Sequence, residues 1–167
     1  ESLLHRSVIA ETERELTSLL DLGAVVELAL DRMLEAVDAT DGVLMLRSPG
    51  DELRAAAVRS QAVAWSTRIR LGEPVVGRDI DSGELVVESE EVGQAVVIPL
   101  AHDGTSLGCV AVTAANSHPF SDEDRQLLVD IAASAVTAIR NAQKHEAALL
   151  QLDRTRSELT ELMDLAG

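Results

Sequence analysis

The sequence predicts an α+β domain in which an antiparallel sheet is covered on both faces and a long helix follows at the C-terminal end. Three observations predict this class. An amphipathic segment at Ala24–Val37 precedes several short apolar runs of strand length. The runs at Ala95–Leu100 and Leu107–Ala114 flank an Asp-Gly turn sequence. From Ser121 to Ala166 the chain then contains neither proline nor glycine.

Two helices are expected before the sheet. Residues 2–20 carry apolar side chains three and four residues apart, which predicts a narrow stripe formed by Leu4, Val8, Leu16, Leu19 and Leu20. Asp21 is the predicted N-cap of the second helix. The apolar residues of that helix share one face, and they are Val26, Ala29, Leu30, Met33 and Val37.

Short apolar runs predict strands at 43–46, 53–58, 67–71, 85–87, 95–100 and 107–114. The last two strands form a tight hairpin, because Asp103 and Gly104 supply the two positive-φ residues of a type I′ turn. Both strands are apolar at odd and even positions, whereas a sheet with one solvated face alternates apolar with polar residues. We therefore expect elements on both faces of the sheet.

The last third of the chain predicts one long helix that begins with a capping box at Ser121 and Asp124. A heptad pattern follows from Leu128 onward, and at ~1.5 Å per residue the helix extends well past a domain of this size. Its apolar residues need another surface, and a parallel second copy is the simplest one. The predicted homodimer interface comprises Leu128, Ile131, Ala135, Ala138, Ala142, His145, Leu149, Leu152, Arg156, Leu159 and Met163.

Composition narrows the possible partners. The 167 residues include 14 Lys and Arg against 29 Asp and Glu, and the net charge of −15 repels nucleic acid and anionic lipid alike. No apolar run approaches the ~20 residues that cross a bilayer, and no leader pattern opens the chain. We expect a cytoplasmic segment that contacts neither nucleic acid nor membrane.

Cysteine and histidine usage argues against redox and metal chemistry. Cys109 is the single cysteine, so the chain cannot form an internal disulfide. The four histidines show no zinc-ligand spacing. No Ser-His-Asp order, paired-carboxylate motif or phosphate-cradling glycine loop is found. The sequence therefore predicts no metal, no cofactor and no enzymatic activity.

Three segments together resemble the GAF domain family. They are the helix and strand of Leu22–Leu46, the segment Arg70–Gly77, and the closing run from Val97-Ile98-Pro99-Leu100 through Leu107–Val112 to Pro119–Asp124. The resemblance covers roughly residues 16–143. It implies an antiparallel sheet of five or six strands, with terminal helices on one face and a small-molecule cavity on the other. It also implies an origin in a bacterial multidomain signalling protein.

On this resemblance the chain divides into an N-terminal linker or dimerisation helix (1–20), a GAF-like sensor domain (21–143) and a coiled-coil signalling helix (144–167). The implied function is a regulatory sensor and dimerisation domain in a signal-transduction protein, including two-component systems. Its effector, downstream in the full-length chain, is of the histidine kinase, cyclase, phosphodiesterase or phosphatase type. Binding of a small molecule or a partner would change the packing of the coiled coil.

Candidate ligand contacts lie in the middle of the chain, which borders the cavity in the family. The candidates are Trp65, Arg68, Arg70, Arg78 and Asp79, with Thr113 at the end of the central strand. Arginine forks suit a small anion or a polar metabolite. The alternatives are surface charge for the arginines, a core position for Trp65 and a hydrogen-bonded hydroxyl for Thr113.

Departures from the patterns of the family narrow the range of expected ligands. Ser117 replaces the lysine of the cyclic-nucleotide-binding signature, Cys109 lies in mid-strand rather than in a pigment-attaching lid, and His102 falls at a hairpin tip. Neither a bilin nor haem is expected. Two alternative functions stay open, a structural dimerisation module without ligand and, more remotely, a free methionine sulfoxide reductase. The latter uses several cysteines, and this chain has one.

Overall fold

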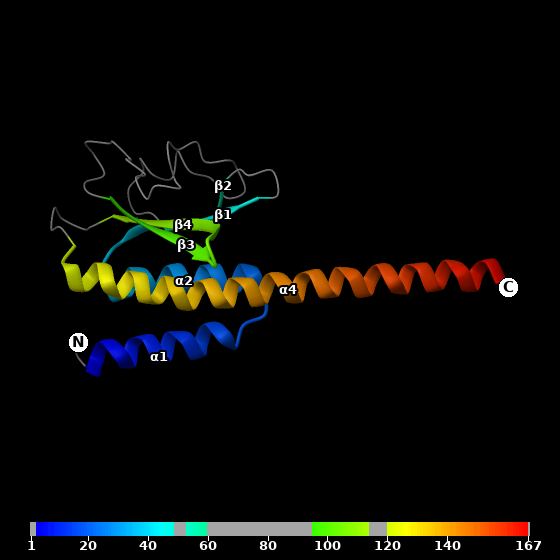
Figure 1. Cartoon of the computed structure of the whole chain (residues 1–167), viewed down its shortest axis with the longest axis horizontal. Coiled ribbons are helices and arrows are strands. Elements are labelled where there is room, and N and C mark those ends of the chain that lie inside the picture. Colours follow the sequence, from blue (N-terminus) through cyan, green and yellow to red (C-terminus); the bar gives the residue numbers. More distant parts are fainter. Residues whose placement is uncertain (1–2, 49–52, 60–94, 114–119, 167) are drawn as a thin grey trace.

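The computed structural model describes residues 3–48, 53–59, 95–113 and 120–166 (Figure 1). In chain order these residues form α1 (Leu3–Thr17), α2 (Leu22–Ala36), β1 (Asp41–Arg47), β2 (Leu53–Arg59), β3 (Ala95–His102), β4 (Thr105–Thr113) and α4 (Asp122–Ala166). The predicted α+β class, the long C-terminal helix and the strands near 43–46, 53–58, 95–100 and 107–114 are confirmed. The strands predicted at 67–71 and 85–87 lie outside the described residues.

The four described strands form one antiparallel sheet in the order β2-β1-β4-β3. β3 and β4 pair as the predicted hairpin, and its turn has φ of 49° at Asp103 and 77° at Gly104. Beside the central strand, Gly108 has φ of 148°, and a Cβ added there would lie 1.9 Å from the Met45 carbonyl oxygen. Only glycine allows β4 to approach β1 this closely.

The helices form two layers on one side of the sheet. Figure 1 shows α2 and α4 against one face of the sheet, with α1 packed on the opposite side of that helical pair. The predicted caps are present. The Ala24 amide donates to Asp21 Oδ2 at 2.9 Å, and Ser121 and Asp124 exchange two hydrogen bonds of 3.1 Å.

Apolar side chains are buried on both faces of the sheet, as the strand pattern predicted. The face toward the helices contributes Leu44, Ala57, Ile98, Leu100, Val110 and Val112 to the main core. The face away from the helices carries a second buried cluster made of Val43, Met45, Leu53, Ala55, Cys109 and Ala111. We call this second surface the far face.

The stripe predicted for the first helix is partly wrong. Leu4 and Leu20 are exposed, whereas His5, Thr12 and Leu16 are the buried residues of α1. These three positions are seven and four residues apart, so they also share one side of a helix. Apolar spacing alone could not reveal that two of the three buried side chains are polar. The face of α2 is as predicted, with Val26, Ala29, Leu30, Met33 and Val37 all buried.

Candidate functional site

The long helix α4 has two parts with different surroundings. As far as Ala142 its core-facing residues are buried against α1, α2 and β3 of the same chain. Five of the predicted dimer contacts belong to this part, and each is at most 1% exposed: Leu128, Ile131, Ala135, Ala138 and Ala142. In this part of α4 the heptad pattern reflects packing within the chain, because α2, α1 and the sheet cover this side of the helix. In this structure these five residues pack within their own chain.

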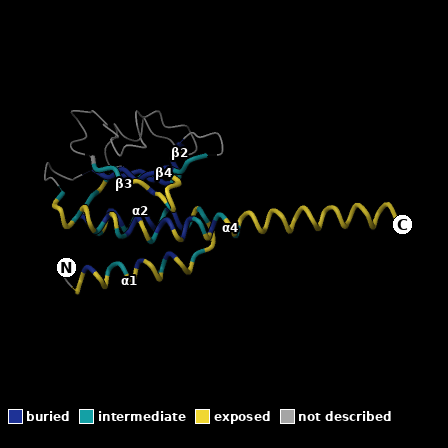
Figure 2. The backbone as a smooth tube through the Cα atoms, viewed as in Figure 1, coloured by how far each residue is buried: buried dark blue, intermediate teal, exposed yellow. Residues whose placement is uncertain are grey.

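We call residues 145–166 of α4 the rod. Figure 2 shows this part of the helix extending away from the domain with its surface exposed. Leu149, Leu152, Leu159 and Met163 are between 53% and 73% exposed, although their spacing of three, seven and four residues puts them on one side. We call these four residues the rod stripe. Arg156 lies within it and His145, which is half-buried, lies at its start.

Other large side chains of the rod lie off this stripe. Leu150 is 61% exposed and follows Leu149 at ~100° around the helix. Leu150 is therefore a matched position of the same residue type and similar exposure that does not belong to the stripe.

A groove of about 630 Å³ lies where the rod leaves the domain. His145, Glu146 and Leu149 of α4 form one wall of the groove. The α1–α2 connection, the start of α2 and the sheet form the other, through Leu20, Asp21, Leu22, Gly23, Val26, Leu46 and Ala56. The rod stripe thus begins at a mostly apolar surface of the domain, and Leu149 belongs to both.

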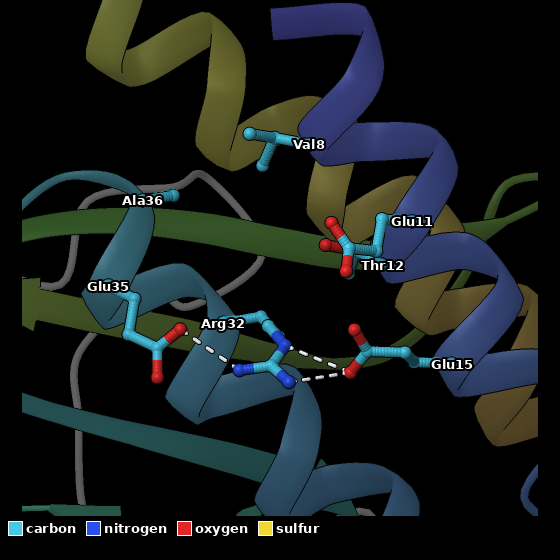
Figure 3. Close-up of a pocket in the computed structure, with 7 residues that line it drawn as sticks. All are labelled: Val8, Glu11, Thr12, Glu15, Arg32, Glu35 and Ala36. Atoms are coloured by element: carbon cyan, nitrogen blue, oxygen red, sulfur yellow. Dashed lines mark hydrogen bonds and ion pairs between the residues drawn. The ribbon is translucent and has the colours of Figure 1, made fainter. Parts of the chain in front are cut away.

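A second cleft, of about 330 Å³, separates α1 from α2 (Figure 3). In it Arg32 of α2 reaches across to α1, where its Nε and Nη2 donate to Glu15 Oε2 at 3.1 and 2.6 Å. Arg32 Nη1 also donates to Glu35 Oε2 at 2.9 Å within α2. The hydrogen bonds that Arg32 donates to Glu15 are the largest cause of the raised pKa of Arg32.

Polar contacts contribute much of the attachment of α1. His5 Nε2 lies 3.0 Å from Asp130 Oδ2 of α4, and Leu16 is the one large apolar side chain of α1 that is fully buried. Burying a leucine is worth about 1.5–3 kcal/mol, and an ion pair between half-exposed groups about 1 kcal/mol or less. A helix of 15 residues is itself marginal in water. The docking of α1 is therefore weaker than that of α2 or α4.

Of the predicted ligand contacts, the structure describes Thr113, which lies on the far face of the sheet. Thr113 is 4% exposed, and its Oγ1 has no hydrogen-bond partner among the described residues, so these residues do not provide the expected hydrogen bond. Its neighbours on this face of β4, Cys109 and Ala111, offer no strong acceptor. Trp65, Arg68, Arg70, Arg78 and Asp79 lie outside the described residues.

Arg47 is a residue of this face that the sequence analysis missed. It ends β1 in the alternation of Val43 and Met45, and its Nη2 donates to Ser106 Oγ at 3.3 Å. Burial raises the pKa of the Cys109 thiol to about 11, and the nearby Arg47 charge opposes this shift. The sequence feature that could have identified Arg47 is a cation that directly follows the apolar run Val43–Leu46, in alternation with Val43 and Met45.

The GAF domain profile matches residues 21–141 of the chain, which is well over half of its length. The chain belongs to the GAF domain family. Its fold is similar to that of the GAF domain of a phosphoenolpyruvate-protein phosphotransferase from Acinetobacter, at 15% identity and a TM-score of 0.67, covering 86% of this chain and 97% of that one. A comparison with curated proteins found no match.

Two further solved structures share the GAF fold. One is the GAF domain of a putative sensor histidine kinase from Pseudomonas syringae pv. tomato (19% identity, TM-score 0.59, 89% of this chain and 93% of that one). The other is the GAF-B domain of DevS from Mycobacterium smegmatis, at 19% identity and a TM-score of 0.60, covering 77% of this chain and 99% of that one. At these identities the likeness is one of fold.

α1 and the rod both lie outside the matched range of the GAF domain. Within the described ranges, no helix combines the length and apolar character that a membrane span requires. The same residues contain no group of three His, Cys, Asp or Glu side chains arranged to hold a metal ion.

Proposed function

We propose that this GAF domain is a non-enzymatic regulatory sensor whose output is the packing of α4 against the same helix of a second copy. Two copies pair in parallel through the rod. A small molecule or partner protein bound at the far face of the sheet biases that packing, because it binds one arrangement more tightly than the other. The rod then passes the change to an effector domain of a cytoplasmic signalling protein, of the histidine kinase, cyclase, phosphodiesterase or phosphatase type.

The exposed rod stripe is the observation that supports this proposal. Each buried leucine contributes about 1.5–3 kcal/mol, so four large apolar side chains per copy supply a substantial driving force for pairing. Surfaces of this kind on a helix are covered in a coiled coil, where residues seven apart meet their equivalents. The comparison structures from a phosphotransferase and from a sensor histidine kinase support a signalling role at the level of the family.

Two polar residues in the stripe limit the strength of pairing. Arg156 would face its own copy in a parallel pair, and His145 lies at the start of the stripe. Polar groups at core positions weaken a coiled coil while fixing its register and number of strands. A pairing of moderate strength suits a switch, because a modest binding energy is then enough to shift it.

Sedimentation equilibrium of the chain tests the pairing. We expect a dimer at tens of micromolar, with Leu152→Glu and Leu159→Glu each raising the dissociation constant at least tenfold, or about 1.4 kcal/mol. Leu150→Glu, which adds the same charge off the stripe, should stay within about threefold of the unmodified chain. A folded monomer at 50 µM or more, or equal effects of the Leu150 and Leu152 changes, would refute pairing through the stripe.

The proposed ligand site is the far face, with Thr113 as its described polar contact and Trp65, Arg68, Arg70, Arg78 and Asp79 as proposed contacts from the middle of the chain. The buried Thr113 hydroxyl has no partner within the described ranges, and a bound polar ligand can satisfy such a group. Thermal-shift screening against nucleotides and small metabolites tests this site. At least one compound should raise Tm, and Thr113→Val should reduce that rise.

The second candidate is a structural dimerisation module without ligand. It is favoured by the complete burial of Val43, Met45, Cys109 and Ala111 on the far face. An intact dimer that no screened compound stabilises would favour this candidate. Cys109 argues against thiol catalysis of the methionine sulfoxide reductase kind, because a buried thiol with a pKa of about 11 is a poor nucleophile at neutral pH.

A further inference from the structure

The helix α1 is attached differently from the other two helices. The buried residues of α2 and α4 are all apolar. In α1, which is described in full, the buried residues are His5, Thr12 and Leu16, and a cleft of about 330 Å³ remains between α1 and α2. Few apolar contacts and incomplete packing are the features of segments that open locally at low free energy.

Charge concentrates on this loosely packed contact. Three carboxylates line the cleft, from Glu11 and Glu15 of α1 and from Glu35 of α2. Among the described lining residues Arg32 is the single cation, and Figure 3 shows its guanidinium between Glu15 and Glu35. Without Arg32 the docked state would bring three negative groups together with no compensating charge, which favours separation of the two helices.

We propose that α1 is a releasable arm that undocks as a unit from the α2/α4 pair while the sheet, α2 and α4 stay folded, and that Arg32 sets its docking equilibrium. The connection from Thr17 to Leu22 spans four residues, so the arm stays beside its docking surface when released. Since His5 contacts Asp130 of α4, release also changes the surroundings of the helix that continues into the rod. The inference goes beyond the proposed function and does not depend on pairing of the rod.

Amide hydrogen exchange of the folded chain, resolved by peptide, tests the arm. In the unmodified chain the amides of α1 should exchange at least about tenfold faster than those of α2, β1 and β4. The amides near His5 and near Leu16 should exchange at similar rates, because the helix leaves as a unit. A gradient that falls steadily from Leu3 toward Thr17 would mean ordinary end fraying and would overturn the proposal.

Arg32→Gln tests the role of charge. We expect this change to speed α1 exchange about tenfold at low salt, and 0.5 M sodium chloride to reverse most of the increase, because salt screens the repulsion that remains among Glu11, Glu15 and Glu35. The matched control is Arg6→Gln, which removes an exposed cation of α1 that forms no ion pair in the described structure. The control should change α1 exchange less than about twofold.

Glu15→Gln separates attraction from repulsion. It removes the partner of Arg32 and one of the three carboxylates together, so α1 exchange should rise only about threefold and show little reversal by salt. Two results for Arg32→Gln would overturn the assignment of Arg32. One is a rise in the α1 exchange rate that salt leaves unchanged. The other is a rise that spreads equally over α2, β1 and β4, because it would show a general loss of packing.

Discussion

Gly108 gives the most direct test of how the sheet is closed. The change Gly108→Ala places a Cβ where the Met45 carbonyl oxygen lies 1.9 Å away, and the backbone φ of 148° is one that residues with side chains rarely adopt. Backbone strain of this kind costs about 1–3 kcal/mol and overpacking about 1–3 kcal/mol or more. The obstacle is a backbone atom of the neighbouring strand, so no rotamer change relieves it. A contact of 1.9 Å is far inside van der Waals distance, so overpacking should cost about 3 kcal/mol or more, and we expect a total loss of roughly 4–6 kcal/mol in the free energy of unfolding.

Gly104→Ala is the matched control for this change. Gly104 also has positive φ, at 77°, but an added Cβ would meet nothing within 4 Å. Only the left-handed backbone cost of about 1–2 kcal/mol should remain. Urea denaturation followed by circular dichroism, at one fixed protein concentration, compares the two variants with the unmodified chain. A Gly108→Ala loss within 1 kcal/mol of the Gly104→Ala loss would refute the close approach of β4 to β1.

Three further changes test other parts of the structure. Ser121→Ala removes a capping-box acceptor and should lower the free energy of unfolding by about 1 kcal/mol in urea melts, whereas Ser157→Ala, at an exposed position inside α4 and away from any helix end, should change it by no more than about 0.5 kcal/mol. Thr113→Val replaces a buried hydroxyl that has no partner among the described residues by a methyl group of similar size. The melts should therefore show stabilisation by about 0.5–1.5 kcal/mol, and destabilisation would mean that the hydroxyl is bonded. Burial raises the pKa of Cys109 from 9.0 to about 11. Above pH 9 the unfolded chain therefore loses a proton that the folded chain keeps, and the free energy of unfolding should fall as pH rises from 9 to 11. Cys109→Ala should remove that part of the decline, and an unchanged slope would contradict the burial of the thiol.

Local chemistry accounts for the elements that could be predicted from the sequence. The Asp103-Gly104 turn, the Asp21 cap and the Ser121–Asp124 capping box each depend on a few neighbouring residues, and all three are present. The burial of both sheet faces followed from strands without polar alternation.

Features that depend on distant partners could not be predicted in this way. The orientation of α1 depends on His5 meeting Asp130 and Glu15 meeting Arg32, pairs that are 125 and 17 residues apart in the chain. Likewise, the sequence around Thr113 does not indicate that its hydroxyl has no acceptor in the part of the chain that the structure describes. Arg47 was overlooked because one cation at a strand end usually reaches solvent, and only the pairing of β1 with β4 places it near Cys109.

The heptad of α4 shows how one pattern can serve two surfaces. The repeat runs without a break. Inside the domain it comprises Leu128 and Ile131 followed by Ala135, Ala138 and Ala142, all of them buried, whereas the leucines and the methionine of the rod stripe are exposed. Small residues let α1 and α2 approach α4 closely, whereas exposed leucines offer more apolar area to a partner that arrives from solution. The change from alanine to leucine falls near His145, where the domain ends. Burial by α1, α2 and the sheet, rather than residue size or spacing, therefore separates the intrachain part of this helix from the rod.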